Sequence, residues 1–275
     1  MLPYHVALVS DESSITIQEL SEVAGALQKQ VTRDFGPIWQ IAADVSAFAS
    51  LERLPLDYWP IIIRDQIDEN ALGYHQDENG QPYSLVKYTN EWTVTASHEL
   101  LEMICDPFGR RVVAGTSPVA GQGRVQFLVE VCDPCESEGF AYPVNGVTVS
   151  DFYTPHFFDP VTAPGVRYSF NNSLTAPYQV REGGYLSWYV PGLDQWWQRT
   201  WFDGGAPSDG PAQVRRGGNP REAIDRITAP HRVRAMKGAR SLAAAREAGA
   251  AGGPSHNFRA RADALRTAAA MAMKT

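Results

Sequence analysis

The segment from Glu91 to Asp106, EWTVTASHELLEMICD, constrains the fold of this chain more than any other stretch. Its apolar residues recur at helical spacing, so one side of the helix is expected to belong to a core. The adjacent side gathers the carboxylates of Glu99, Glu102 and Asp106 around the imidazole of His98. The sequence therefore predicts a helix over 91–106 with a polar cluster beside its buried face.

The pair His98 and Glu102 has the i, i+4 spacing at which two side chains of one helix can bind one ion. The spacing is that of the His-Glu-x-x-His helix of zinc hydrolases, in which the intervening Glu acts as general base. Glu102 stands where the second His would be. A carboxylate can bind zinc, but its negative charge lowers the Lewis acidity of the metal. The alternative is an exposed charge network without a metal.

A second acidic segment, EVCDPCE at 130–136, follows an apolar stretch. Glu130 or Asp133 could supply the further ligand that a zinc site needs from beyond the motif helix. Alternatively, the segment is a turn with surface acids, a small disulfide loop between Cys132 and Cys135, or a thiolate zinc site. Because hard cations favour oxygen, Ca²⁺ is the alternative to Zn²⁺, held by four carboxylates: Glu102, Asp106, Glu130 and Asp133.

Two further segments offer groups that could act on a substrate. Tyr153 and His156 lie in VSDFYTPHFFDP, and either could donate a hydrogen bond to the oxyanion of a tetrahedral intermediate. His75 is a similar candidate in the predicted hairpin over 73–89. For the aromatic-rich loop, the alternative role is packing.

The first part of the chain reads as strands and helices in alternation, with a helix expected over 15–35 before the motif helix. Strand-like stretches cover 5–10, 38–48 and 58–67, and Glu78-Asn79-Gly80 marks the turn of the hairpin. After Pro107 the chain has short β-like segments between Gly and Pro: 124–131, 144–150 and 185–190.

These patterns predict an α+β fold, with a mixed β-sheet and packed helices including the motif helix. We expect three parts: an N-terminal subdomain over 1–106, a loop-rich β subdomain over 107–205 that completes the site, and a flexible basic tail over 206–275. The tail is rich in Ala and Arg and has few large apolar residues, which predicts marginal helices weakly attached to the core.

Charge is distributed unevenly along the chain. The net charge is −7, but residues 201–275 carry 13 Lys and Arg against 6 Asp and Glu, which makes them +7 and the first 200 residues −14. An acidic body does not suit a specific nucleic acid partner, whereas the tail could bind an acidic partner or a larger assembly. The chain shows neither a transmembrane stretch nor a recognisable signal peptide, so we expect a cytoplasmic protein, or one exported without such a signal.

The order of these segments, with TASHELLEMICDP after strands and a hairpin, resembles the N-terminal half of zincin metallopeptidases. HELLEMICDP followed by EVCDPCE also resembles exordium-like and phage-associated proteins, and this likeness covers roughly residues 70–160. The resemblance implies a peptide or protein substrate and an edge strand over 73–89 that binds it. It also implies His98 and Glu102 as zinc ligands and Glu99 as the base, with a third ligand from this set: Asp106, Glu130 or Asp133.

Overall fold

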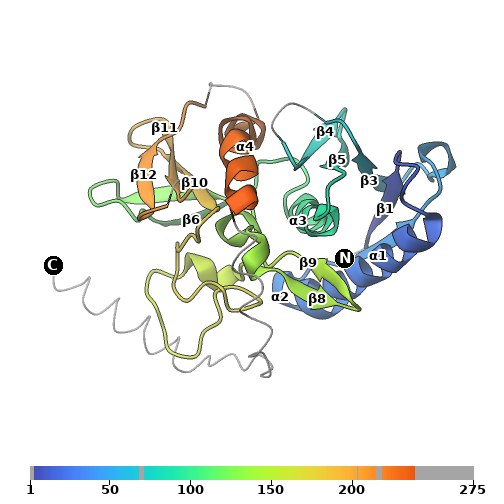
Figure 1. Cartoon of the computed structure of the whole chain (residues 1–275). Coiled ribbons are helices and arrows are strands. Elements are labelled where there is room, and N and C mark those ends of the chain that lie inside the picture. The colour runs from blue at the N-terminus through green and yellow to red at the C-terminus, as the bar shows by residue number, and fades with distance from the viewer. Residues whose placement is uncertain (1–2, 68–70, 203, 215–218, 239–275) are drawn as a thin grey trace.

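The structure is a computed structural model that describes residues 3–67, 71–202, 204–214 and 219–238. It contains two five-stranded sheets with helices packed between and around them, which confirms the predicted α+β fold (Figure 1). The second half of the chain consists of short strands and loops, as expected from its glycines and prolines.

The first sheet is mixed and has the strand order β2-β1-β3-β5-β4. Strands β1, β2, β3 and β5 run parallel to their neighbours, and only β4 is antiparallel, at the edge beside β5. The predicted edge strand is therefore β4 alone, because β5 lies inside the sheet. The bounds are β1 Tyr4–Ser10, β2 Ala43–Ala47, β3 Tyr58–Arg64, β4 Gly73–Glu78 and β5 Gln81–Lys87.

The hairpin between β4 and β5 turns at Asn79 and Gly80, as the sequence predicts. Both residues have positive φ, 54° and 81°, which is the geometry that an Asn-Gly pair favours in a two-residue hairpin turn. The turn fixes the register, so Gly73 pairs with Val86 and His75 with Ser84. Gly73 and His75 consequently lie on the same face of β4.

The helix predicted over 15–35 is present but changes its geometry. Helix α1, Ile17–Lys29, begins with the Thr16 side chain accepting from Glu19 N and continues into a π-helical segment, η1 Gln30–Phe35, and a short α2, Gly36–Trp39. The β-like stretch predicted over 38–48 is wrong at its start, because the chain is still helical to Trp39 and β2 covers only its later part.

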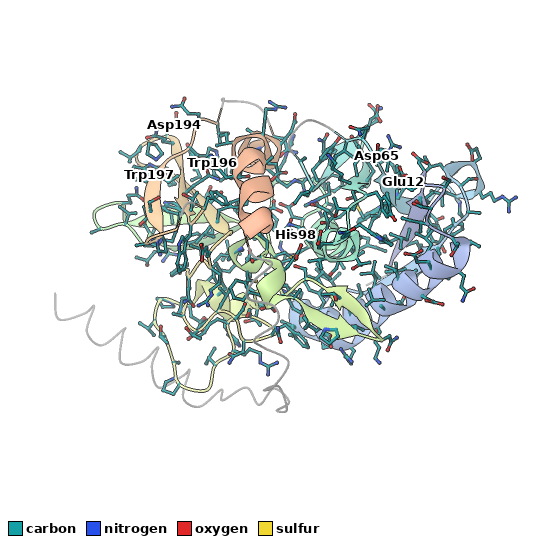
Figure 2. All side chains as sticks on the ribbon, viewed as in Figure 1. Glu12, Asp65, His98, Asp194, Trp196 and Trp197 are labelled. Carbon is teal, nitrogen blue, oxygen red and sulfur yellow. The ribbon has the colours of Figure 1, made fainter. Side chains whose placement is uncertain are left out.

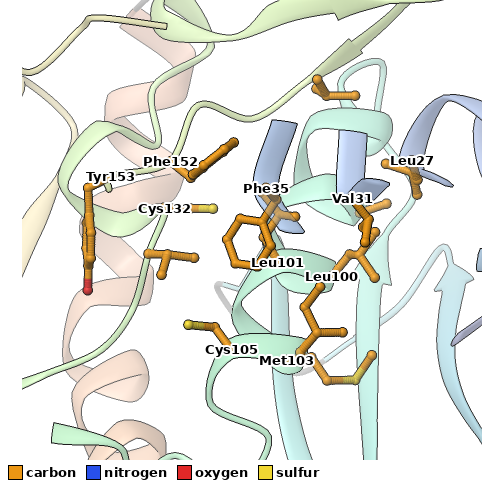
Figure 3. Close-up of a cluster of buried hydrophobic side chains, with 14 of the residues drawn as sticks. Leu27, Val31, Phe35, Leu100, Leu101, Met103, Cys105, Cys132, Phe152 and Tyr153 are labelled. Carbon is orange, nitrogen blue, oxygen red and sulfur yellow. The ribbon is translucent and has the colours of Figure 1, made fainter. Parts of the chain in front are cut away.

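Helix α3, Trp92–Cys105, confirms the predicted motif helix, with Glu91 and Asp106 as its flanking caps. It packs against β3, β4 and β5 on one side and against β9 of the second half on another. Apolar residues of α3 meet those of α1 and η1 in the main core, where Figure 3 shows Leu100 near Val31. Because the second half covers its remaining side, α3 is buried around nearly its whole circumference.

The second sheet is antiparallel, with the strand order β12-β11-β10-β7-β6. Its strands are β6 Val112–Thr116, β7 Arg124–Leu128, β10 Tyr185–Val190, β11 Gln195–Thr200 and β12 Ser208–Pro211. A small hairpin joins β8 Tyr142–Val144 to β9 Val147–Val149, and short 3₁₀ turns occupy η2 Leu51–Arg53, η3 Asp133–Cys135, η4 Glu138–Phe140 and η5 Pro155–Phe158.

The predicted weak attachment of the tail is corrected for the part that the structure describes. Strand β12 extends the second sheet, and helix α4, Pro220–Gly238, lies between that sheet and α3 (Figure 1). The side chains of Arg221, Ile224 and Thr228 are almost completely buried. One face of α4 therefore packs against the rest of the protein. Its apolar contact is made by Ile224, which the polar composition of the tail does not reveal. Residues 239–275 lie outside the described residues.

None of the helices in the described part of the chain is long and apolar enough to cross a membrane.

Close packing between β10 and η3 gives a test of the second half. A Cβ at Gly184 would lie 2.5 Å from the carbonyl oxygen of Asp133 and 2.8 Å from that of Pro134, and these backbone atoms cannot rotate away. We expect Gly184→Ala to destabilise the protein by about 1–3 kcal/mol in chemical unfolding. Gly192→Ala is the control, because nothing lies within 4 Å of its Cβ position. Equal stability of the two variants would contradict this packing.

Candidate metal centre

His98 and Glu102 point from α3 toward the segment that follows β7, so that the interior of the molecule holds an imidazole among carboxylates. His98 Nε2 lies 3.0 Å from Glu102 Oε2 and 3.4 Å from Asp133 Oδ1. The three residues are 4%, 3% and 2% exposed, and Figure 2 shows His98 between the two halves of the molecule. This burial excludes the exposed charge network and the turn with surface acids that the sequence left open.

Glu130 completes this group from the strand side. Oxygen atoms of Glu102, Glu130 and Asp133 lie within 4.8 Å of one another. The residue is 5% exposed, and neither carboxylate oxygen of Glu130 has a hydrogen-bond partner. A buried carboxylate without a donor is costly, and a cation among these ligands would remove that cost. The described residues thus fit a divalent metal.

The surroundings of Glu130 favour its protonated form when no metal is bound. Burial raises the pKa of Glu130 well above its ordinary value of 4.5, the charge of Glu102 raises it further, and the Arg221 guanidinium opposes both effects. Metal binding requires the ionised carboxylate, so a cation at this position would release a proton from Glu130.

The backbone of the EVCDPCE segment orients Glu102. The amide of Cys132 donates to Glu102 Oε1 at 3.0 Å, leaving Oε2 as the oxygen next to His98. Cys132 and Cys135 are both free thiols, which excludes the disulfide loop that the sequence left open as an alternative. Burial raises the pKa of each thiol, which favours the protonated form over the thiolate that zinc requires. Cys132 nevertheless lies within reach of His98 and Glu102.

Glu99 lies beside this group but faces β4. Its Oε2 is 3.2 Å from Nδ1 of His75, and both side chains are almost fully buried. Gly73 makes room for it, because a Cβ at Gly73 would lie 2.8 Å from Glu99 Oε1. Ligand atoms of His75, Glu99 and Glu102 fall within 4.8 Å of one another, so the Glu99 carboxylate is adjacent to the proposed metal ligands.

Asp106 has a different role from the one that the sequence suggests. Its two carboxylate oxygens accept from the backbone amides of Arg110 and Arg111, at 3.0 and 2.9 Å, and close the turn after α3. Burial raises the pKa of Asp106, and these two hydrogen bonds oppose the shift. Asp106 belongs to none of the metal-competent groups within the described ranges.

The two residues proposed from VSDFYTPHFFDP lie in different surroundings in the structure. Tyr153 is completely buried, and its hydroxyl has no hydrogen-bond partner. Burial raises the pKa of Tyr153, and the charges of Glu130, Glu102 and Asp133 add to that shift, so the phenol is near the cluster. His156 instead lies in η5, where Nδ1 is 3.6 Å from Asp159 Oδ2, and it belongs to no metal-competent group in the described chain.

Sequence reasoning missed two residues of this region, Glu136 and Arg221. Glu136 lies within reach of His98 and Asp133, whereas His75, already a candidate from the sequence, contacts Glu99. Arg221 reaches the turn after α3 from the segment assigned to the tail. Only Glu136 carried a signal, because it ends the same acidic segment as Asp133.

Comparisons of the chain with models of protein families, with curated proteins and with solved structures gave no match. The resemblance to zincins and to exordium-like proteins therefore stays a prediction, and the function of the site has to be argued from its geometry.

The raised pKa of Glu130 predicts how metal-free protein responds to pH. The folded state holds this proton more tightly than the unfolded state, so stability is lost as pH rises above the ordinary value of 4.5 toward the raised one. We expect urea unfolding with a chelator to show stability falling as pH rises above the ordinary pKa of a glutamate.

Glu130→Gln should remove part of that fall, about 1.4 kcal/mol for each unit of pKa shift. Glu22→Gln, at an exposed position of α1, is the control that should leave the slope unchanged. A Glu130→Gln protein with the wild-type slope would show that this carboxylate is not protonated in the folded state.

Proposed function

We propose that this protein is a zinc-dependent metallohydrolase that cleaves peptides. The observation that carries the proposal is the convergence of His98 and Glu102 from α3 with Glu130 and Asp133 from the following segment, with the Glu99 carboxylate alongside. One imidazole and several carboxylates suit Zn²⁺, whereas Ca²⁺ takes oxygen ligands. The presence of His98 therefore favours zinc over the calcium alternative.

The chain's own groups can be given roles around such a centre. His98, Glu102, Glu130 and Asp133 would hold the ion, and bound zinc would polarise a peptide carbonyl and lower the pKa of a water molecule. Glu99 would take the proton of that water and pass it to the leaving amine. His75 orients the Glu99 carboxylate through the 3.2 Å contact, and the Tyr153 hydroxyl would donate to the developing oxyanion.

A peptide substrate is supported by the position of β4. This strand is at the edge of the first sheet and carries His75, which contacts Glu99. An extended peptide could pair with the outer edge of β4 through backbone hydrogen bonds. Its carbonyl groups would then run past the Glu99 side of the cluster.

A second candidate is a non-enzymatic protein in which the same residues hold a structural ion. The observation that favours it is burial, because every carboxylate of the cluster is at most 7% exposed. Structural zinc sites are typically closed by four protein ligands, whereas catalytic sites keep one position open. The two candidates share the metal and differ in hydrolysis.

Metal content tests what the candidates share. We expect elemental mass spectrometry of protein purified without chelators to find about one zinc per chain, the occupancy of a single four-ligand site. His98→Ala should lose this zinc, because it removes the imidazole. His156→Ala is the matched control and should keep it, since His156 lies outside the cluster. Absence of bound metal from the wild type would contradict both candidates.

Hydrolysis separates them. Glu99→Gln should retain zinc but lower the rate of peptide cleavage by about 10²–10⁴-fold, because the amide cannot take the proton. Glu91→Gln is the control, because Glu91 is the N-cap residue of the same helix and lies outside the cluster. This variant should cleave at the wild-type rate. Zinc-loaded wild type that cleaves no member of a peptide library would favour the structural ion, and an unchanged rate in Glu99→Gln would reject Glu99 as the base.

A further inference from the structure

Arg221 is an internal cation whose position is fixed from several sides. Its side chain is 1% exposed, and Nη1 donates to the carbonyl oxygen of Asp106 at 3.0 Å. Its backbone amide donates to Asn219 Oδ1, and Asn219 Nδ2 donates to the carbonyl of Phe108. Gly109 lies against the side chain, since a Cβ there would be 3.0 Å from Cζ of Arg221. The start of α4 is thus locked onto the turn that ends α3.

One edge of this guanidinium, called the open edge, has no hydrogen-bond partner among the described residues. Both Nε and Nη2 of Arg221 are buried, and neither has a hydrogen-bond partner. These two nitrogens form the edge that binds a carboxylate in a bidentate manner. The same edge does so elsewhere in this protein: Arg33 donates from Nε and Nη2 to Asp34, and Arg199 donates from the same atoms to Asp209.

The nearest internal carboxylates do not fill this edge. Asp106 offers Arg221 only its carbonyl, because its carboxylate is taken by backbone amides. Glu130 is close enough for the charge of Arg221 to act on it, yet its own oxygens accept no hydrogen bond. A buried guanidinium with open donors is costly, and a ligand carboxylate would satisfy both donors at once.

We propose that the open edge of Arg221 binds a carboxylate of the substrate beside the metal centre. This inference rests on the proposed function and narrows its substrate class to peptides with a carboxylate next to the cleaved bond. Two sources share that chemistry, the C-terminal carboxylate and an Asp or Glu side chain. The surrounding acids repel an anion, so carboxylate binding at Arg221 requires the cation that neutralises them.

The test measures binding separately from hydrolysis. N-acetylglycine and its neutral amide are titrated into zinc-loaded wild type by calorimetry. The acid should bind at least about tenfold more tightly than the amide, a ratio that corresponds to one good charge-assisted contact. Equal affinity of the two probes in the wild type would overturn the proposal, whatever the variants do.

Two variants separate the open edge from simple charge. Arg221→Lys keeps the charge without the planar pair of donors, and Arg221→Met removes both. Each should lose the preference for the acid while retaining zinc. Arg226→Met, an exposed arginine one turn further along α4, is the matched control and should behave as wild type. A preference for the acid that persists in Arg221→Met would place the carboxylate on the metal and overturn the proposal.

Peptide cleavage then identifies the source. If amidation of the peptide C-terminus raises KM, Arg221 binds the terminal carboxylate. If replacement of an acidic side chain by its amide raises KM, Arg221 binds that side chain. Arg221→Lys should raise KM for the preferred peptide and leave KM for the uncharged analogue of that peptide unchanged. If neither modification changes KM, the substrate proposal fails. Absence of hydrolysis of all peptides instead rejects the proposed function, and the binding result still stands.

Discussion

Carboxylates that are buried together repel one another, and the centre of this protein brings four of them within reach of His98 or His75, with Glu130 beside Glu102 and Asp133. Removing an ion from water costs several kcal/mol even after the protein relaxes, so such a cluster persists only where cations or hydrogen-bond donors compensate it. The chain supplies some compensation itself. The backbone amide of Cys132 donates a hydrogen bond to Glu102, and α4 brings the positive charge of the Arg221 guanidinium to the end of α3. Neither oxygen of Glu130 has a hydrogen-bond partner, and either a proton or the proposed divalent cation would neutralise its charge.

The packing of the two halves brings these charged groups together. Helix α3 is held against the first sheet by its apolar residues, and its polar side then faces the segment after β7. That segment approaches closely because Gly184 lets β10 lie on the carbonyls of Asp133 and Pro134. Helix α4 fixes the other end of α3 through Arg221. The cluster is therefore assembled from elements that each pack for ordinary apolar reasons and meet at the charged side chains.

Local signals allowed much of the fold to be predicted. Helical spacing located α3, and Asn79-Gly80 located the hairpin, because both depend on residues near one another in the chain. The i, i+4 relation of Asp106 to Glu102 made it a ligand candidate, but this spacing does not reveal that two backbone amides donate to its carboxylate. The contact between His75 and Glu99 depends on strand order, which places β4 over α3.

The sequence pattern also did not predict the docking of α4. Its composition is polar and rich in Ala and Arg, which resembles a solvated tail, and a single face with Ile224 and Arg221 is enough to anchor it. A buried Arg is recognisable only when its surroundings are known, since most arginines in such a sequence are exposed. The candidate centre was thus half predictable: its residues on α3 and in EVCDPCE were identified, whereas the groups that orient and neutralise them came from the tertiary structure.

The central claim is that His98, Glu102, Glu130 and Asp133 hold one metal ion. Anomalous diffraction at the zinc absorption edge, from crystals of protein purified without chelators, tests it most directly. The account predicts a single internal peak about 2.0–2.2 Å from His98 Nε2 and from carboxylate oxygens of this group. A peak bound instead to the sulfur atoms of Cys132 and Cys135, or the lack of any peak within coordination distance of His98, would contradict it.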